Sequence, residues 1–197
     1  MKQKPKIFFL TLTSAILILI VIFIISLLYI EKNTKLNILH SLNNIKLLTH
    51  KGLEIKDVNI SGKPLLMFFG FTHCPEVCPT TLIKLEKILK DINHGNKIKI
   101  IFVTLDPERD TVNNLGNYLD EFDELVIGLT GDIKEISRFA KKWNVFWEKI
   151  NYDKNDYNIN HTSTVFMIDK KGEFSGTISW GENEKSIILK IKKLLAH

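Results

Sequence analysis

Hydrophobic and polar residues divide this chain into one long apolar run and a series of shorter patterned segments. The apolar run covers residues 7–30 without a charged side chain, and a polar stretch rich in Lys and Asn follows over residues 31–43. From Gly62 onward, short apolar runs alternate with segments whose apolar residues recur at helical spacing. The pattern predicts an apolar N-terminal helix, a polar tether and a domain over residues 44–197.

The domain segments are typical of an α/β fold. We expect strands at 64–70, 97–104 and 125–129, a strand hairpin at 163–168 and 174–178, and helices at 81–93, 112–122, 133–143 and 182–195. Asp132 is a candidate N-cap for the third helix. Because the first strand and the second are separated by a helix, the crossover predicts a parallel pair.

The apolar run is long enough to cross a membrane. Its 24 residues would reach about 36 Å as a helix, against a hydrocarbon core of about 30 Å. A cleaved signal peptide is the alternative, but the run exceeds the usual apolar region of about 7–15 residues and has no A-x-A-like cleavage site. We therefore expect an uncleaved transmembrane anchor.

The residues around the anchor predict its location and orientation. The tail of residues 1–6 is too short for an Arg-rich mitochondrial transit peptide, which favours a bacterial inner membrane. Lysines stand on both sides of the apolar run, and the denser group at Lys2, Lys4 and Lys6 favours a cytoplasmic N-terminus. A single-pass protein with its domain on the periplasmic side is expected.

Net charge adds little once the tail is set aside. The whole chain carries +5, and from Glu31 onward 24 Lys and Arg stand against 22 Asp and Glu. No block of like charge remains that could form a phosphate-binding stripe. Nucleic acid is therefore not an expected partner.

The chain has two cysteines, Cys74 and Cys78, placed where the first strand gives way to the first helix. The N–H groups of a helix N-terminus lower the pKa of a nearby thiol. Neither cysteine falls on the apolar stripe of the predicted helix, which argues against inert buried thiols. At i, i+4 spacing, the two sulfurs can form a disulfide or bind one metal ion.

Neither chemistry is complete with two cysteines at this spacing. The usual dithiol oxidoreductase has two residues between its cysteines, whereas three separate this pair, and a structural zinc site needs four ligands. His161 is a candidate third ligand, because it follows a polar loop that begins near Tyr152 and directly precedes an apolar strand. An exposed loop histidine is the alternative interpretation of the same residue.

Four motifs together resemble one known family. They are GKPLLMFFGFTHCPEVCPTTL at 62–82, TLDPERDT at 104–111, GLTG at 128–131 and NHTSTVFMID at 160–169. Their order and content are similar to the Sco/SenC family of thioredoxin-like copper-binding proteins, which assist assembly of cytochrome c oxidase. The resemblance implies a thioredoxin-like fold behind the membrane anchor.

By that resemblance, Cys74, Cys78 and His161 match the family's copper ligands. The family usually has Asp before this histidine, where the present chain has Asn160. Two thiolates and an imidazole suit Cu(I) or Zn(II), and the same donors can also hold Cu(II). Copper is therefore the expected metal, with a copper donor protein and the copper-bearing subunit of the oxidase as expected partners.

Two functions remain open from the sequence. The first is a membrane-anchored copper chaperone, not an enzyme, that helps metallate the dinuclear copper centre of the oxidase. The second is a thiol-disulfide reductase that uses Cys74 and Cys78 as a redox pair to keep the oxidase cysteines reduced. Only copper delivery needs His161. A peroxidase is not favoured, because the P-x-x-x-[TS]-x-x-C pattern is missing at both cysteines.

The charged segment 106–111 and the tryptophans have simpler interpretations. Asp110 or Thr111 can cap the following helix, and Arg109 can pair with a nearby carboxylate and shape the loop. Trp143 and the other tryptophans are expected in the core or at an interface rather than at copper.

Overall fold

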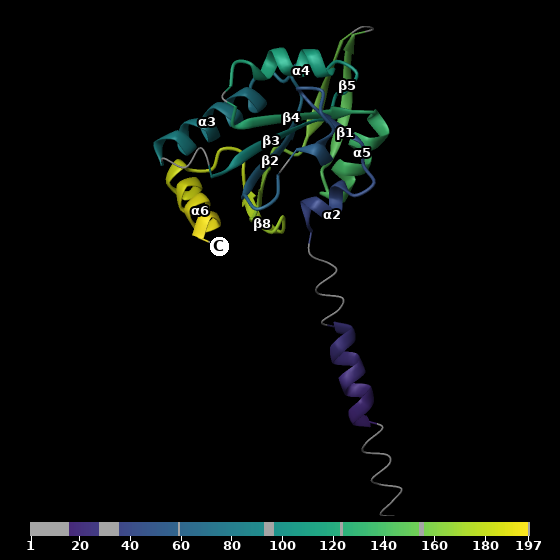
Figure 1. Cartoon of the computed structure of the whole chain (residues 1–197). Coiled ribbons are helices and arrows are strands. Elements are labelled where there is room, and N and C mark those ends of the chain that lie inside the picture. The colour runs from purple at the N-terminus through teal and green to yellow at the C-terminus, as the bar shows by residue number, and fades with distance from the viewer. Residues whose placement is uncertain are drawn as a thin grey trace, which may run out of the picture. The chain divides into compact units, whose positions relative to one another are not determined.

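A computed structural model describes residues 16–27, 36–58, 60–92, 97–122, 124–153 and 156–196 (Figure 1). The chain divides into two compact units, Met1–Lys35 and Leu36–His197. Each unit is described by itself below.

The second unit is a mixed α/β domain built around one large sheet. Its elements are α2 (Ile38–Leu42), β1 (Leu47–Thr49), η1 (Ile55–Asp57), β2 (Leu65–Gly70), α3 (Val77–Asp91), β3 (Lys99–Thr104), α4 (Val112–Leu119), β4 (Val126–Gly131), α5 (Ile133–Lys142), β5 (Trp147–Asp153), β6 (Asp156–His161), β7 (Val165–Ile168), β8 (Phe174–Ile178) and α6 (Glu184–Ala196).

The large sheet has the strand order β1-β4-β3-β2-β7-β8. β2 and β3 are parallel, in a register that pairs Leu65 with Lys99, and β3 and β4 are also parallel. This confirms the crossover that the sequence predicts. β7 runs antiparallel to β2 and forms the predicted hairpin with β8.

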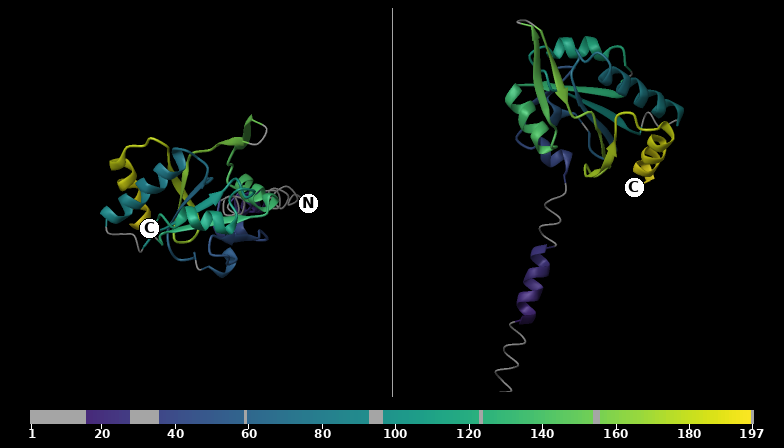
Figure 2. Two further views of the ribbon diagram at one scale, coloured as in Figure 1. Left: turned by 90° about the horizontal axis from the view of Figure 1, so that it is seen from above. Right: turned by 180° about the vertical axis from the view of Figure 1, so that it is seen from behind.

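Apolar side chains of the central strands alternate between two cores, as the two-residue period of a strand requires. On one face of the sheet, Leu66 and Phe68 pack with buried residues of α3, α4 and α6. On the other face, Met67 and Phe69 pack with α5 and α2. Figure 2 shows α3 and α6 beside each other, away from α5. Both faces are covered, which explains why β2 is a continuous apolar run.

The sequence pattern did not predict the β5–β6 hairpin, which carries His161. β5 and β6 form a separate two-stranded antiparallel sheet, and it extends beyond the large sheet in Figure 2. The sequence predicted a polar loop from about Tyr152 to His161 and no strand over 147–151, because Asn, Asp and Lys dominate this region and hide the strand pattern. His161 is consequently the last residue of a strand, rather than the end of a loop.

The domain begins earlier than the sequence predicts. Residues 36–43, expected in the tether, include α2, whose Ile38 is 1% exposed. The amide of Phe174 donates to the carbonyl of Leu36, and the amide of Ile38 donates to that of Gly172. Backbone hydrogen bonds therefore attach this segment to the β7–β8 turn.

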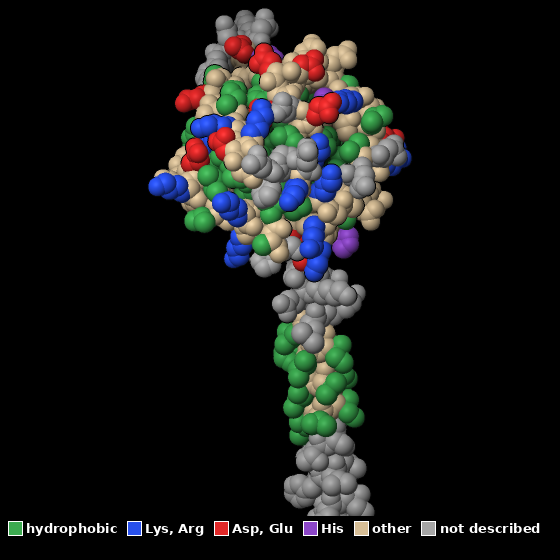
Figure 3. Space-filling model, turned by 60° about the vertical axis from the view of Figure 1, so that its left-hand side comes forward, with side chains coloured by type: hydrophobic (Ala, Val, Ile, Leu, Met, Phe, Trp, Pro, Cys, Tyr) green, Lys and Arg blue, Asp and Glu red, His purple; other side chains and the backbone are tan. Residues whose placement is uncertain are grey.

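Within the first unit, the described residues are a helix over 16–27. Its side chains are exposed, and all of them except Ser26 are apolar. Figure 3 shows apolar side chains over the face in view. None of the helices described in the structure is long and apolar enough to cross a membrane. The rest of the predicted 7–30 anchor and the 1–6 tail lie outside the described residues.

Candidate metal centre

The site begins at the end of β2, where the chain turns into α3. α3 starts at Val77, four residues before the predicted start, so that Cys78 lies in its first turn. Cys78 is fully buried and shares a helical stripe with Leu82 and Leu85. The expectation that neither cysteine lies on the apolar stripe was therefore wrong for Cys78. Pro75 and Pro79, one after each cysteine, concealed the helix start, although a proline is tolerated in a first helical turn.

Gly70 allows this close packing of the helix on the sheet. A Cβ atom at Gly70 would lie 2.7 Å from the Cys78 sulfur and 2.8 Å from the ring of Phe102. No carbon–sulfur contact of that length is tolerated without displacement. The last residue of β2 therefore has to be glycine for Cys78 to reach its present position.

The three predicted ligands converge, although His161 is 83 residues from Cys78. The ligand atoms of Cys74, Cys78 and His161 all lie within 4.8 Å of one another. The Cys78 sulfur is 3.7 Å from His161 Nε2, and the Cys78 amide donates to the Cys74 sulfur at 3.4 Å. The His161 side chain is half-buried, so the exposed-loop alternative does not hold.

Aromatic rings and a backbone carbonyl orient the histidine. The His161 ring makes edge-to-face contacts with Phe68 and Phe71, at centroid distances of 6.1 and 5.8 Å. Its Nδ1 lies 3.0 Å from the carbonyl oxygen of Thr162. In the tautomer whose Nδ1 carries the proton and donates to that carbonyl, the lone pair of Nε2 is available to bind a metal ion. In the other tautomer, Nε2 carries the proton and can donate to a sulfur. The sequence indicated Phe68 only as part of a buried strand and gave no sign that Phe71, just after it, contacts the histidine.

The two thiols differ in acidity. The pKa of Cys74 is lowered to about 4, because the Cys78 thiol donates a hydrogen bond to its sulfur, with further donation from His161 and from backbone amides. The pKa of Cys78 is raised, because its proton is held in that hydrogen bond and its side chain is buried. Cys74 is therefore the more acidic thiol of the pair.

A cavity of about 230 Å³ gives access to this cluster. Its lining includes Cys74, His161 and Asn160, together with the segment from Pro75 to Val77. Cys74 is 8% exposed and Cys78 is not exposed. An incoming group therefore meets the Cys74 and His161 side first.

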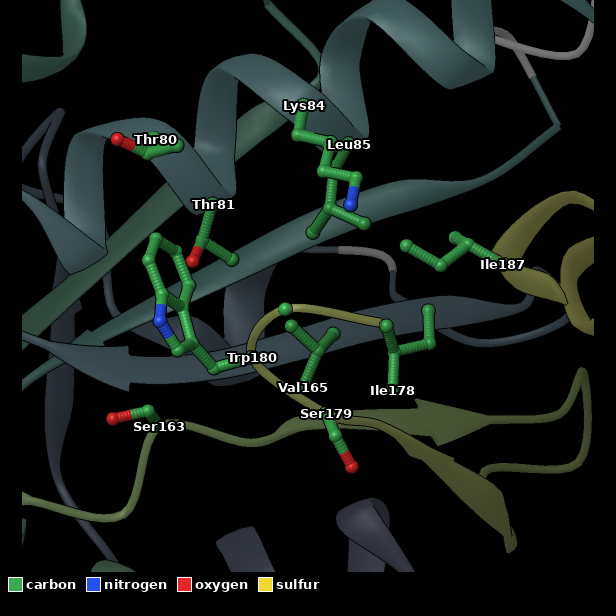
Figure 4. A pocket seen from close by; sticks show the side chains of 11 residues that line it. Thr80, Thr81, Lys84, Leu85, Ser163, Val165, Ile178, Ser179, Trp180 and Ile187 are labelled. Atoms are coloured by element: carbon green, nitrogen blue, oxygen red, sulfur yellow. The ribbon is translucent and has the colours of Figure 1, made fainter. Parts of the chain in front are cut away.

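A second pocket lies along α3 and shares Ser163 with the first cavity. It has about 240 Å³ and is lined mainly by apolar groups, among them Leu85, Val165, Ile178 and Trp180. Figure 4 shows these side chains between α3 and the loop that follows β8. Its lining contains no Cys, His, Asp or Glu. Of these two cavities, only the first is therefore lined by described residues that could bind a metal ion.

The charged segment after β3 has the structural roles that the sequence suggests. Thr111 is the N-cap of α4 and accepts from the amide of Asn114. Arg109 forms an ion pair with Asp106. Asp110 is fully buried rather than at the cap, and its burial raises the pKa of its carboxyl group. Trp143 is 1% exposed and lies in the core, as expected.

The donor set fits a soft metal ion. All three ligand atoms lie within 4.8 Å of one another, close to the separation of donors that bind one ion at about 2.0–2.3 Å each. Two sulfurs and one imidazole nitrogen match copper or zinc better than magnesium or calcium, which prefer oxygen. A mixed α/β domain with such a cluster at the start of a helix defines a thioredoxin-like metal-binding protein.

Comparison with known proteins identifies the family. The SCO1/SenC family model matches residues 40–196, and the chain therefore belongs to the SCO1/SenC family. A SCO2-like protein of Rickettsia prowazekii is 39% identical over 66% of this chain and 64% of its own length. The mitochondrial SCO1 homolog 1 of Arabidopsis thaliana is 35% identical over 65% of this chain and 39% of its own length. The match thus spans less than two thirds of these relatives.

Solved structures of relatives show the same fold, in two cases with copper. Bradyrhizobium japonicum ScoI with copper bound has a TM-score of 0.69 at 33% identity, over 76% of this chain and 96% of its own. Yeast Sco1 with copper bound has a TM-score of 0.69 at 30% identity, over 77% and 86%. BsSco, described with a disulfide switch as a member of the Sco family of cytochrome c oxidase assembly proteins, has a TM-score of 0.58 at 21% identity, over 76% and 90%.

Proposed function

We propose that this protein is a membrane-anchored copper chaperone that helps metallate the dinuclear copper centre of cytochrome c oxidase. The observation that carries the proposal is the convergence of Cys74, Cys78 and His161 within 4.8 Å. Copper-bound relatives with the same fold support the choice of metal. The oxidase as recipient rests on the family alone.

The site suits transfer of the ion better than storage. Three protein donors leave a coordination position open, through which an incoming ligand can take up the metal. The cavity opens beside Cys74 and His161, so a copper donor protein and the copper-bearing oxidase subunit can approach from the same side. Cu(I) is the primary cargo, and Cu(II) suits the same donors.

Replacement of His161 by Ala tests this proposal. It removes the imidazole and leaves both cysteines in place. We expect the affinity of the reduced domain for copper to fall at least about tenfold, or about 1.4 kcal/mol, and the spectrum of bound Cu(II) to change. Oxidase maturation should be lost in cells. His40→Ala is the matched control, because His40 is exposed on α2.

Disulfide formation separates this effect from a general loss of structure. The Cys74–Cys78 disulfide should form in His161→Ala nearly as in the parent chain, because neither thiol is altered. Normal copper affinity together with normal oxidase maturation in this variant would contradict the copper chaperone.

Thiol-disulfide reduction is the second candidate function, and the lowered pKa of Cys74 favours it. The Cys74 thiolate would attack a disulfide in the oxidase subunit and form a mixed disulfide. Cys78 would then lose its proton, displace the target thiolate and close the Cys74–Cys78 disulfide. Two electrons pass to the target, and an external dithiol would restore the pair. A pure reductase should retain oxidase maturation in His161→Ala.

We also propose that residues 7–30 anchor the domain to a bacterial inner membrane, with the domain in the periplasm. The absence of charge over this run and the apolar side chains on every side of residues 16–27 support an anchor. The full chain should fractionate with membranes. An impermeant thiol reagent should label Cys74 in cells with an intact inner membrane, and labelling only after lysis would reverse the orientation.

A further inference from the structure

His161 is carried by an element that the large sheet does not hold. β6 pairs only with β5 in a sheet of two strands, whereas the cysteines are attached to β2 in the centre of the large sheet. His161 is also linked through residues 162–164 to β7, which pairs with β2. The separation between His161 and the cysteines therefore depends on this link and on contacts between the β5–β6 hairpin and the rest of the domain. The segment after β3, residues 106–110, supplies such contacts and is called the positioning loop below.

One end of the positioning loop holds β6 through Tyr157. The Tyr157 hydroxyl donates to Asp106 at 2.6 Å, and Arg109 Nη1 donates to the Tyr157 carbonyl at 3.1 Å. The Arg109 guanidinium carbon lies 3.7 Å from the centroid of the Tyr157 ring. Arg109 Nε also donates to Asp106, and Asp106 is fully buried. Charge-assisted hydrogen bonds of this partly buried kind are stronger than those between neutral groups.

Tyr157 transmits this restraint along β6. Tyr157 and His161 are four residues apart in one strand, so both lie on the same face, about 13 Å apart. Ile159, between them on that face, is 4% exposed and packs in the core. A displacement of Tyr157 is therefore passed along β6 toward His161.

The other end of the positioning loop holds the segment before the cysteines. The Asp110 carboxylate accepts from the Thr72 amide at 3.0 Å and from the Thr72 hydroxyl at 2.6 Å. The Thr104 hydroxyl, at the end of β3, donates to the same carboxylate at 2.5 Å. Thr72 is two residues from Cys74, and Asp110 is adjacent to Arg109. One short loop thus contacts both halves of the candidate metal centre.

We propose that the positioning loop sets the separation between His161 and the two cysteines, with Arg109 as the positioning residue on the histidine side. This inference rests on the proposed function and adds to it the residues that bring the third ligand into place. Weakening the Arg109 contacts releases β6 and with it His161, whereas the cysteines keep their own attachment through Asp110 and α3.

A double-mutant cycle tests the proposal with purified chain 36–197, which contains both cores. Arg109→Lys keeps the positive charge beside Asp106 but loses the planar group that reaches Tyr157. We expect Cu(I) affinity to fall about three- to tenfold when His161 is present. In the His161→Ala background, the same change should alter affinity less than twofold, because no imidazole remains to be positioned.

The chain provides a matched control, since its other arginine is Arg138. Arg138 lies on α5 and pairs with Glu135 at 2.8 Å, so Arg138→Lys should leave copper affinity unchanged in both backgrounds. An equal fall for Arg109→Lys with and without His161 would overturn the proposal, because Arg109 would then act on the whole fold or on the cysteines. No fall in either background would also overturn it.

A metal-free measurement distinguishes this proposal from the proposed function. The rings of Phe68 and Phe71 flank His161, so the NMR shifts of its ring protons report its position. Arg109→Lys should move these shifts and Arg138→Lys should not. Weak copper binding by the parent chain together with this movement would count against the chaperone and for the positioning loop. Unmoved shifts would overturn the positioning loop whatever the copper affinity.

Discussion

The smallest feature on which the site depends is the missing side chain at Gly70. The Cys78 sulfur occupies space that a Cβ atom at this position would need, since the two would be 2.7 Å apart. The Cys78 side chain is fully buried and cannot retreat into solvent. The position of the Cys78 thiol therefore depends on Gly70, which has no side chain and cannot bind a metal ion through one.

Gly70→Ala should lower both stability and copper affinity. The added methyl group forces Cys78 or Phe102 to move, which costs about 1–3 kcal/mol in the free energy of unfolding. Displacement of the sulfur also spreads the three donors. Urea unfolding and a Cu(I) competition titration measure the two effects.

Gly116→Ala is the control for that prediction. Gly116 lies within α4, and the nearest atom to its Cβ position is the His50 carbonyl oxygen at 3.4 Å. Alanine in a helix interior is favoured over glycine by about 1 kcal/mol. This variant should be as stable as the parent or more so, with unchanged copper affinity. Equal losses in both variants would remove the special role of Gly70.

At the scale of elements, the start of α6 depends on one carboxylate. Glu182 accepts from the Ser179 amide at 3.0 Å, from the Ser186 hydroxyl at 2.7 Å and from Lys190 Nζ at 2.9 Å. The hydrogen bond from Lys190, followed by that from Ser186, lowers the pKa of Glu182 to about 2. The ionised carboxylate therefore connects the β8–α6 loop to the first turns of α6.

Glu182→Gln should lower the free energy of unfolding at neutral pH. It should also make that free energy depend less on pH in the acid range. The pKa of Glu182 in the folded protein lies below its ordinary value of 4.5. Its contribution is thus complete above about pH 4.5 and is lost as the pH falls toward about 2. We expect a loss of roughly 1 kcal/mol at pH 7. Thermal unfolding from pH 7 to pH 2 measures it.

Glu184→Gln provides the comparison within the same helix. Glu184 is exposed in the first turn of α6, so its neutralisation should cost a few tenths of a kcal/mol at most. If both variants lost stability equally at pH 7, the Glu182 contacts would have no specific role.

At the scale of the whole molecule, the domain boundary determines which chain can be studied alone. Both hydrophobic cores lie inside Leu36–His197. Ile38 contributes a fully buried side chain to the core beside α5. A chain that starts at residue 44 would lack α2 and expose part of that core.

A chain of residues 36–197 should therefore be soluble and more stable than one of residues 44–197. Loss of a buried isoleucine costs about 2–5 kcal/mol, and the backbone bonds at Leu36 and Ile38 disappear with it. Urea unfolding of the two chains, with Ile38→Ala in the longer one as the control, measures the difference. Equal stability of all three would show that α2 contributes nothing to the core.

Local sequence patterns predicted the strands that are buried on both faces and the helix that begins at an N-cap residue. β2 and β3 are continuous apolar runs because helices cover both faces of their sheet, and α5 begins at its expected cap, with Asp132 accepting from the Lys134 amide at 2.8 Å. The cysteine spacing and the four motifs also indicated the family and the ligand residues. Each of these signals lies within a few consecutive residues, where the sequence can be interpreted directly.

Only the tertiary structure decided how those ligands come together. The polar β5–β6 hairpin gives no clear pattern, because one strand pair at the edge of the domain buries few residues, such as Ile159. The burial of Cys78 depends on Gly70, and the position of His161 depends on contacts to β6 from a loop about 50 residues earlier in the chain. Such contacts join residues that are distant in sequence, and no local periodicity records them. The sequence by itself therefore determined the candidate ligands, and long-range packing decided their geometry.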